Sequence, residues 1–211
     1  MTNQNGKVVV IAAPSGAGKT SLVKALIESS PDIDVAVSHT TRSMRPHEVD
    51  GINYHFIGVE DFRTLQAEDG FVESAEVFGN LYGTSRDAMN RIIQQGKHLV
   101  LEIDWQGANQ IREKVPSAIS IFILPPSLAT LKQRLQSRGQ DDAAAIERRT
   151  QEAMNEISHF EEFDFLVVND DFDVAVRQIC SIIETGEPEF NLKHQLEAQR
   201  SLLSELLTSS L

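Results

Sequence analysis

The 211-residue chain is poor in cysteine, in aromatic residues and in positive charge. Its single cysteine, Cys180, has no partner for an intrachain disulfide bond, which is typical of proteins from a reducing compartment. No apolar run approaches the roughly 18 residues that a membrane-spanning helix needs. The chain has 19 lysine and arginine residues against 31 aspartate and glutamate residues, and its net charge of −12 disfavours broad contacts with nucleic acid or anionic lipid. These absences predict a cytoplasmic protein without nucleic-acid or membrane partners.

Apolar, strand-like runs alternate along the chain with helical patterns. The expected strands are 8–12, 35–38, 98–103, 118–123 and 165–168. The alternation predicts an α/β fold whose parallel sheet is flanked by helices. Residues 40–82 break it with short β-like pieces, several glycines and one short helix over 59–66, which predicts a small mixed α/β lobe inserted into the core.

The stretch VVVIAAPSGAGKTSL, residues 8–22, leads from a buried strand through a glycine-rich turn into a helix. It matches GxxxxGK[ST] except that Ala13 replaces the first glycine, which the turn tolerates if the φ angle of Ala13 is negative. We predict an ATP-binding P-loop in which Lys19 bridges to the transferred phosphate and Thr20 helps to hold Mg²⁺. The predicted ATP-binding residues of this P-loop NTPase-type core are Ala13, Pro14, Ser15, Gly16, Ala17, Gly18, Lys19 and Thr20.

The loop beyond the second strand suggests the acceptor. The chain lacks the NKxD pattern of GTPase switches, and its small size and inserted lobe favour a kinase for a small acceptor. Arg42 and Arg45 lie three residues apart, and Tyr54 follows a glycine turn. Two guanidinium groups and a phenol can converge on one phosphate dianion. A solvated pair of surface arginines is the alternative that these residues alone leave open.

Two further segments carry charges that suit phosphate transfer. Glu102 and Asp104 end an apolar strand, where an acid of a P-loop enzyme holds Mg²⁺ directly or through water. Between Lys132 and Arg149, basic residues flank a glycine break at 139–142. This pattern is typical of a helical lid that closes over phosphates, and a solvated helix face is the alternative.

Four separated motifs, APSGAGKTSL, SHTTRSMRPHEVDGINYHF, FVESAEVFGNLYGTS and LEIDWQGA, closely resemble those of bacterial guanylate kinases. The resemblance runs from about Lys7 to Gly186 and implies transfer of the γ-phosphate of ATP to GMP or dGMP with Mg²⁺, as part of purine metabolism. The GMP phosphate clamp that it implies is Arg42, Arg45, Tyr54 and Tyr82. The guanine-binding residues that it implies are Ser38, Glu73, Thr84 and Asp104. The catalytic cations that it implies are Lys19, Arg42, Arg134, Arg138 and Arg149.

Several points stay open within this resemblance. Asp104 suits either guanine or the magnesium shell, and Asn169 is expected near the adenine or its loop. Taken alone, Glu73 stands in an alternating stretch, and that pattern favours a solvent-facing strand position. A scaffold module that binds phosphorylated proteins is disfavoured by the intact Lys19 and Thr20. A kinase for another phosphorylated acceptor, such as a ribose bisphosphate, is disfavoured by the base-reading residues.

The predicted organisation has four parts. They are a P-loop core over 1–37, 87–127 and 151–188, a GMP-binding lobe over 38–86, a lid over 128–150, and a C-terminal helix over 189–211. Four leucines of the last part fall on one helical stripe, Leu192, Leu196, Leu203 and Leu207. An apolar stripe of this kind packs either on the core or on a second subunit, so a homo-oligomer is one of the two expectations.

Overall fold

The computed structural model describes residues 6–137 and 143–208. The chain divides into two compact units. The first contains the described residues up to Val9 together with Pro31–Ala118, and the second contains Val10–Ser30 together with the described residues from Ile119 onward.

The main sheet has five strands in the order β2-β7-β1-β8-β9. Every residue of β1 (Val8–Ala12) is buried, as expected for a strand of a parallel sheet that is covered on both faces. In the first unit β2 (Ile33–Val35) pairs in parallel with β7 (His98–Glu102). In the second unit β8 (Ile119–Leu124) pairs in parallel with β9 (Phe165–Val168). The predicted parallel α/β fold is therefore confirmed.

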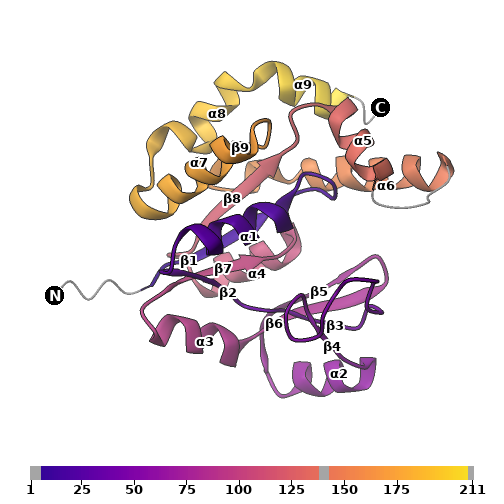
Figure 1. Ribbon diagram of the computed structural model, residues 1–211, viewed down its shortest axis with the longest axis vertical. Coiled ribbons are helices and arrows are strands. Elements are labelled where there is room, and N and C mark those ends of the chain that lie inside the picture. Colours follow the sequence, from indigo (N-terminus) through magenta and orange to yellow (C-terminus); the bar gives the residue numbers. More distant parts are fainter. Residues whose placement is uncertain (1–5, 138–142, 209–211) are drawn as a thin grey trace. The chain divides into compact units, whose positions relative to one another are not determined.

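A smaller sheet in the first unit has the order β4-β3-β6-β5. Its strands are β3 (His39–Thr40), β4 (His55–Phe56), β5 (Phe71–Val77) and β6 (Asn80–Ser85). Helix α2 (Val59–Ala67) covers it, and Phe62 of α2 is fully buried against Phe71 and Leu81. Figure 1 shows this small sheet and α2 together. The small mixed lobe predicted from the glycine-rich segment is confirmed as a structural feature.

Two helices of the first unit begin at side chains that cap them. The Ser85 hydroxyl accepts a hydrogen bond from the Ala88 amide at the start of α3 (Arg86–Gln94). The Asp104 carboxylate accepts one from the Gly107 amide at the start of α4 (Trp105–Lys114). Such caps satisfy amide groups that have no partner within the helix. Helix α3 contacts β7, and α4 contacts β5 of the small sheet.

The second unit is mainly helical around β8 and β9 (Figure 1). Its α-helices are α1 (Lys19–Ser29), α5 (Leu128–Ser137), α6 (Ala143–Ile157), α7 (Phe172–Thr185), α8 (Leu192–Ala198) and α9 (Arg200–Thr208). Its short 3-10 helices are η1 (Phe160–Glu162) and η2 (Pro188–Phe190). Helix α7 contacts α1, both α7 and α8 contact β9, and α9 contacts α6. No helix in the described part of the chain is long and apolar enough to cross a membrane.

Two details differ from the sequence-based expectations. The second strand ends at Val35, and Ser38 lies between β2 and β3, because the chain leaves the edge of the main sheet there and enters the small one. The C-terminal segment forms two helices with a break at Gln199. In α9 Leu203 and Leu206 are buried while Leu207 is exposed. The prediction of a single helix was wrong, and Leu207 does not belong to the buried leucine stripe.

Candidate active site

The predicted phosphate loop joins β1 to α1 in the second unit. Gly16 and Gly18 have φ angles of 92° and 94°, values that residues with a side chain rarely adopt. Among the described residues that carry a side chain, only His47, Asp69 and Phe78 have a positive φ. Ala13 therefore meets the condition under which alanine can replace the first glycine of the motif.

Three side chains from distant parts of the second unit hold this loop. The Asn169 Nδ2 donates to the Ala17 carbonyl at 2.7 Å, and an Arg134 Nη donates to the same oxygen at 3.4 Å. On the other side, the Ser15 amide donates to a Glu156 carboxylate oxygen at 2.8 Å. The Ser15 amide is thus engaged by a carboxylate, and the Ala17 amide donates to the Pro14 carbonyl at 3.0 Å. The Gly16 and Gly18 amides are therefore the candidate phosphate donors of this loop. No local motif marks Glu156, and sequence reasoning did not identify it.

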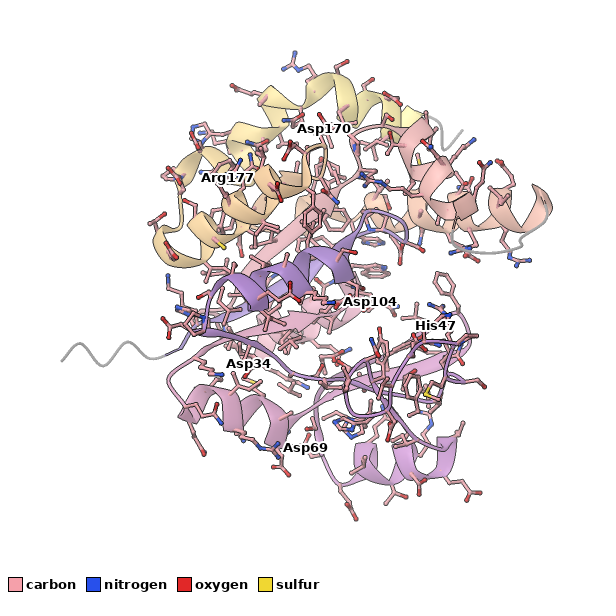
Figure 2. All side chains as sticks on the ribbon, in the orientation of Figure 1. Asp34, His47, Asp69, Asp104, Asp170 and Arg177 are labelled. Atoms are coloured by element: carbon pink, nitrogen blue, oxygen red, sulfur yellow. The ribbon has the colours of Figure 1, made fainter. Side chains whose placement is uncertain are left out.

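A cavity of about 260 Å³ borders the loop. Its lining residues are Gly16, Gly18, Ser21, Arg134, Asn169, Asp170 and Phe172. Asn169 is buried, and its side chain lies so close to Gly18 that a Cβ atom there would come within 2.6 Å of Nδ2. The Asp170 side chain labelled in Figure 2 stands just before the start of α7, where Asp171 caps the helix through the Val174 amide. The structure therefore places the Asn169 side chain against the phosphate loop, and its expected position near the adenine stays a prediction.

The predicted lid arginines have separate positions. Arg134 lies on α5 and, besides Ala17, donates to the Asn169 carbonyl at 3.3 Å. Arg149 is half-buried on α6, whereas Arg148 is exposed and lies 3.9 Å from Glu152 one helical turn away. Arg138 and the glycine break at 139–142 lie outside the described residues.

A cluster of Arg42, Tyr54 and Tyr82 forms in the first unit. The Arg42 guanidinium lies 5.6 Å from the centre of the Tyr54 ring, and the two tyrosine rings meet edge to face at 5.8 Å. Arg42 also donates two hydrogen bonds to Glu48, at 2.8 and 3.1 Å, and Glu48 accepts a third from the Arg45 amide. Glu48 fixes the plane of the guanidinium in this way, because an arginine fork and a carboxylate pair through two parallel bonds.

Burial and hydrogen bonds determine which groups of this cluster carry a charge or a proton. Burial, with the nearby Glu102 and Tyr82, raises the pKa of Tyr54 to about 12, so the phenol keeps the proton that it would donate. Burial acts against the charge of Glu48, but its hydrogen bonds with Arg42 and the Arg45 amide lower the pKa of this carboxyl overall. The Arg45 side chain is exposed, and of the four predicted clamp residues it is the one outside the ring cluster.

Three buried polar residues lie side by side in the same unit. The Ser38 and Thr84 hydroxyls are 3.1 Å apart. Glu73 on β5 is paired with Thr84 on β6 and is only 3% exposed. Burial raises the pKa of Glu73 to about 7; hydrogen bonds from Thr84 oppose this shift, and the Asp104 charge adds to it. The solvent-facing alternative for Glu73 is thereby excluded.

Thr84 and Tyr82 are two positions apart on β6, so their side chains point to the same face of that strand. One predicted base-reading residue, Thr84, and one predicted phosphate-binding residue, Tyr82, therefore share a face of β6. Asp104, labelled in Figure 2, uses one carboxylate oxygen to cap α4 and the other to accept from the Gln106 side chain. Its charge also acts on Glu73.

The described residues contain no group of three or more His, Cys, Asp and Glu side chains that could hold a metal ion. Mg²⁺ that arrives with a polyphosphate keeps several waters and takes few protein ligands beside the phosphates. Thr20, in the first turn of α1, offers the hydroxyl that such a P-loop site uses.

Comparisons with known proteins agree with this chemistry. The guanylate kinase family model matches residues 5–186. The guanylate kinase of Pseudomonas fluorescens (strain Pf0-1) is 51% identical over 207 residues, covering 98% of this chain and all of its own. That of Alkalilimnicola ehrlichii is 50% identical and covers 96% of this chain and 97% of its own. A crystal structure of guanylate kinase from Anaplasma phagocytophilum superposes with a TM-score of 0.73 at 31% identity, covering 95% of both chains. The chain belongs to the guanylate kinase family.

Proposed function

We propose that this chain is a kinase that transfers the γ-phosphate of ATP to GMP and releases ADP and GDP. The observation that carries the proposal is the buried Glu73 carboxylate, which lies in the same unit as an arginine and two tyrosines that suit a phosphate. A site of this kind fits a nucleoside monophosphate. The phosphate loop of the second unit supplies the site for the donor nucleotide.

Glu73 supports guanine as the base. Guanine presents N1–H and an exocyclic amino group side by side, and one carboxylate can accept hydrogen bonds from both. Adenine presents an acceptor at N1, which would leave the buried carboxylate without donors. Unpaired buried groups of this kind can reject a close analogue by about 10⁴-fold. Ser38 and Thr84 complete the set of polar groups proposed to read the base.

The transfer itself needs little covalent chemistry from the protein. The attacking phosphate oxygen of GMP is ionised at neutral pH, so the step requires no general base. The obstacle is charge, because two unit negative charges 4 Å apart repel by about 4 kcal/mol at an effective dielectric constant of 20. Lys19 and Arg149 are proposed to neutralise the donor phosphates, and Arg42, Arg45, Tyr54 and Tyr82 to hold the acceptor phosphate.

Mg²⁺ bound to ATP supplies further positive charge, and Thr20 and Asp104 are its proposed protein ligands, Asp104 directly or through water. We propose the domain organisation that was predicted from the sequence, including Arg134 and Arg138 in the lid. Packing of α9 on α6 supports the core-packing alternative for the C-terminal segment. The single cysteine and the net charge of −12 support action in the cytoplasm on small nucleotides.

Coupled measurement of ADP release with GMP, AMP, CMP and UMP as acceptors, at fixed ATP and Mg²⁺, tests the proposal. We expect kcat/KM for GMP to exceed that for AMP by at least about 10³-fold. Equal rates with GMP and AMP would contradict the guanine assignment. Binding of GMP without turnover of any acceptor would favour the scaffold alternative.

A further inference from the structure

Helix α4 holds strand β5 on both sides of Glu73. The Gln110 side chain makes two hydrogen bonds with the backbone of Ser74, accepting from the amide at 3.1 Å and donating to the carbonyl at 2.7 Å. One helical turn later, the Lys114 ammonium donates to the Val72 carbonyl at 2.7 Å. The two chain neighbours of Glu73 are therefore tied to one helix.

These contacts coincide with an irregularity in the strand. The register of β5 against β6 shifts between Phe71 and Glu73, so Val72 is the additional residue of a β-bulge. A bulge rotates the side chains beyond it relative to the regular alternation. The backbone groups of a bulged residue lose their regular hydrogen-bond partners on the neighbouring strand. At Val72 the Lys114 ammonium supplies such a partner to the carbonyl. Helix α4 thus stabilises the strand conformation that turns Glu73 inward.

The same helix leaves room for the carboxylate itself. A Cβ atom built on Gly107 would stand 2.6 Å from a Glu73 carboxylate oxygen and 3.3 Å from the Ile103 side chain. Gly107 lies in the first turn of α4, and its amide donates to Asp104. Glycine is a poor helix former, so its presence at position 107 lowers the stability of α4. The space that the Glu73 carboxylate needs explains why a glycine stands there.

We infer that Gly107 and Gln110 determine base specificity by positioning Glu73, Gly107 through the space that it leaves and Gln110 through the backbone that it holds. Neither residue touches the base in this account, so both are positioning residues. The inference rests on the proposed function, because it assigns these roles through guanine recognition by Glu73. It assigns to two residues of α4 the role of supporting the residues that are proposed to bind the base.

Gly107→Ala tests whether the space beside Gly107 is needed for the position of the Glu73 carboxylate. Alanine favours the helix, whereas displacement of the buried Glu73 carboxylate costs packing energy. A cooperative thermal transition of the variant therefore serves to show that it is folded. We expect kcat/KM for GMP to fall at least tenfold, because the carboxylate must leave its place and charge-assisted hydrogen bonds are lost. IMP keeps N1–H but lacks the 2-amino group, so the preference for GMP over IMP should fall about fivefold or more. KM for ATP should stay within twofold.

A double variant separates positioning from general disturbance. Glu73→Asp shortens the side chain by one methylene and withdraws its oxygens from the place of the alanine Cβ. In the Glu73→Asp background, Gly107→Ala should therefore lower kcat/KM for GMP less than threefold. Equal effects in both backgrounds would overturn the role of Gly107.

Gln110→Ala provides a test that does not depend on Gly107, and Glu113→Ala, at an exposed position of the same helix, is its control. We expect Gln110→Ala to raise KM for GMP threefold to tenfold and to leave KM for ATP unchanged, while the control changes neither.

If the native chain prefers GMP strongly but Gly107→Ala and Gln110→Ala keep that preference and the native KM for GMP, the inference fails and the proposed function stands. If the native chain does not distinguish GMP from IMP and AMP, the proposed function fails first.

Discussion

Replacing Glu73 by glutamine should stabilise the unliganded protein while removing its use of GMP. Burial raises the pKa of Glu73 from its ordinary value of 4.5 to about 7. The folded chain therefore binds this proton more tightly than the unfolded chain does, and folding stability falls as the pH rises from 4.5 to 7. At 1.36 kcal/mol for each tenfold difference in proton affinity, ionised Glu73 lowers the free energy of unfolding by about 3 kcal/mol above pH 7.

Glutamine at this position has nearly the same shape and keeps an oxygen for Thr84, but it does not ionise. The variant and the native chain should be equally stable near pH 4.5, and the variant should be more stable by about 3 kcal/mol at pH 8. For a chain of this length, that difference corresponds to a rise in melting temperature of roughly 6–12 °C. Urea unfolding and calorimetry at a series of pH values measure both quantities.

Other groups titrate in the same pH range. The test therefore uses the difference in the free energy of unfolding between the Glu73→Gln variant and the native chain at each pH. Burial and the charge of the neighbouring His55 lower the pKa of His39, which makes stability rise with pH in both proteins and cancels in the difference. Glu76→Gln, at an exposed position of the same strand, should leave the pH dependence unchanged. A Glu73→Gln protein whose stability follows the native curve at every pH would refute the reasoning. In the same protein kcat/KM for GMP should fall at least about 100-fold.

Three further substitutions test other parts of the site. Lys19→Met should lower kcat by about 10³-fold or more, with little change in GMP affinity by calorimetry, and normal turnover would remove the role of the phosphate loop. Arg149→Ala should lower kcat by about 10³-fold, and a loss confined to GMP affinity would contradict its place near the donor phosphates. Glu48→Ala should raise KM for GMP about tenfold, because Arg42 loses the carboxylate that orients it; an unchanged KM would show that Arg42 needs no such support.

The sequence predicted the features that depend on neighbouring residues. The apolar run of β1, the glycine turn and the start of α1 follow from local periodicity and backbone preference, and all three appear as expected. The sequence did not predict the contacts that hold the phosphate loop. Glu156 and Asn169 bond to Ser15 and Ala17 across 141 and 152 residues of sequence. Such bonds depend on how helices and strands pack, which no local pattern records.

Glu73 shows the same limit within a single strand. Strict alternation along β5 would place Val72 and Glu73 on opposite faces, one buried and one exposed. The structure buries Phe71, Val72 and Glu73 in succession, because the bulge at Val72 interrupts the alternation. The side chains that accompany the bulge, Gln110 and Lys114, come from a helix about 40 residues further on. The burial of Glu73 therefore has a physical cause that periodicity alone does not reveal.

The acceptor site explains how an acidic protein can bind an anion selectively. In the unliganded chain the Arg42 charge is balanced by Glu48, and the Glu73 carboxyl holds its proton up to a pH of about 7. In the proposed complex the phosphate accepts hydrogen bonds from Arg42 and the tyrosines, and the two adjacent donors of guanine stabilise ionised Glu73. A ligand with the phosphate but without those donors leaves the buried carboxylate charge unpaired. In the proposed function, selectivity for the base thus arises from the same buried group that lowers the stability of the unliganded fold.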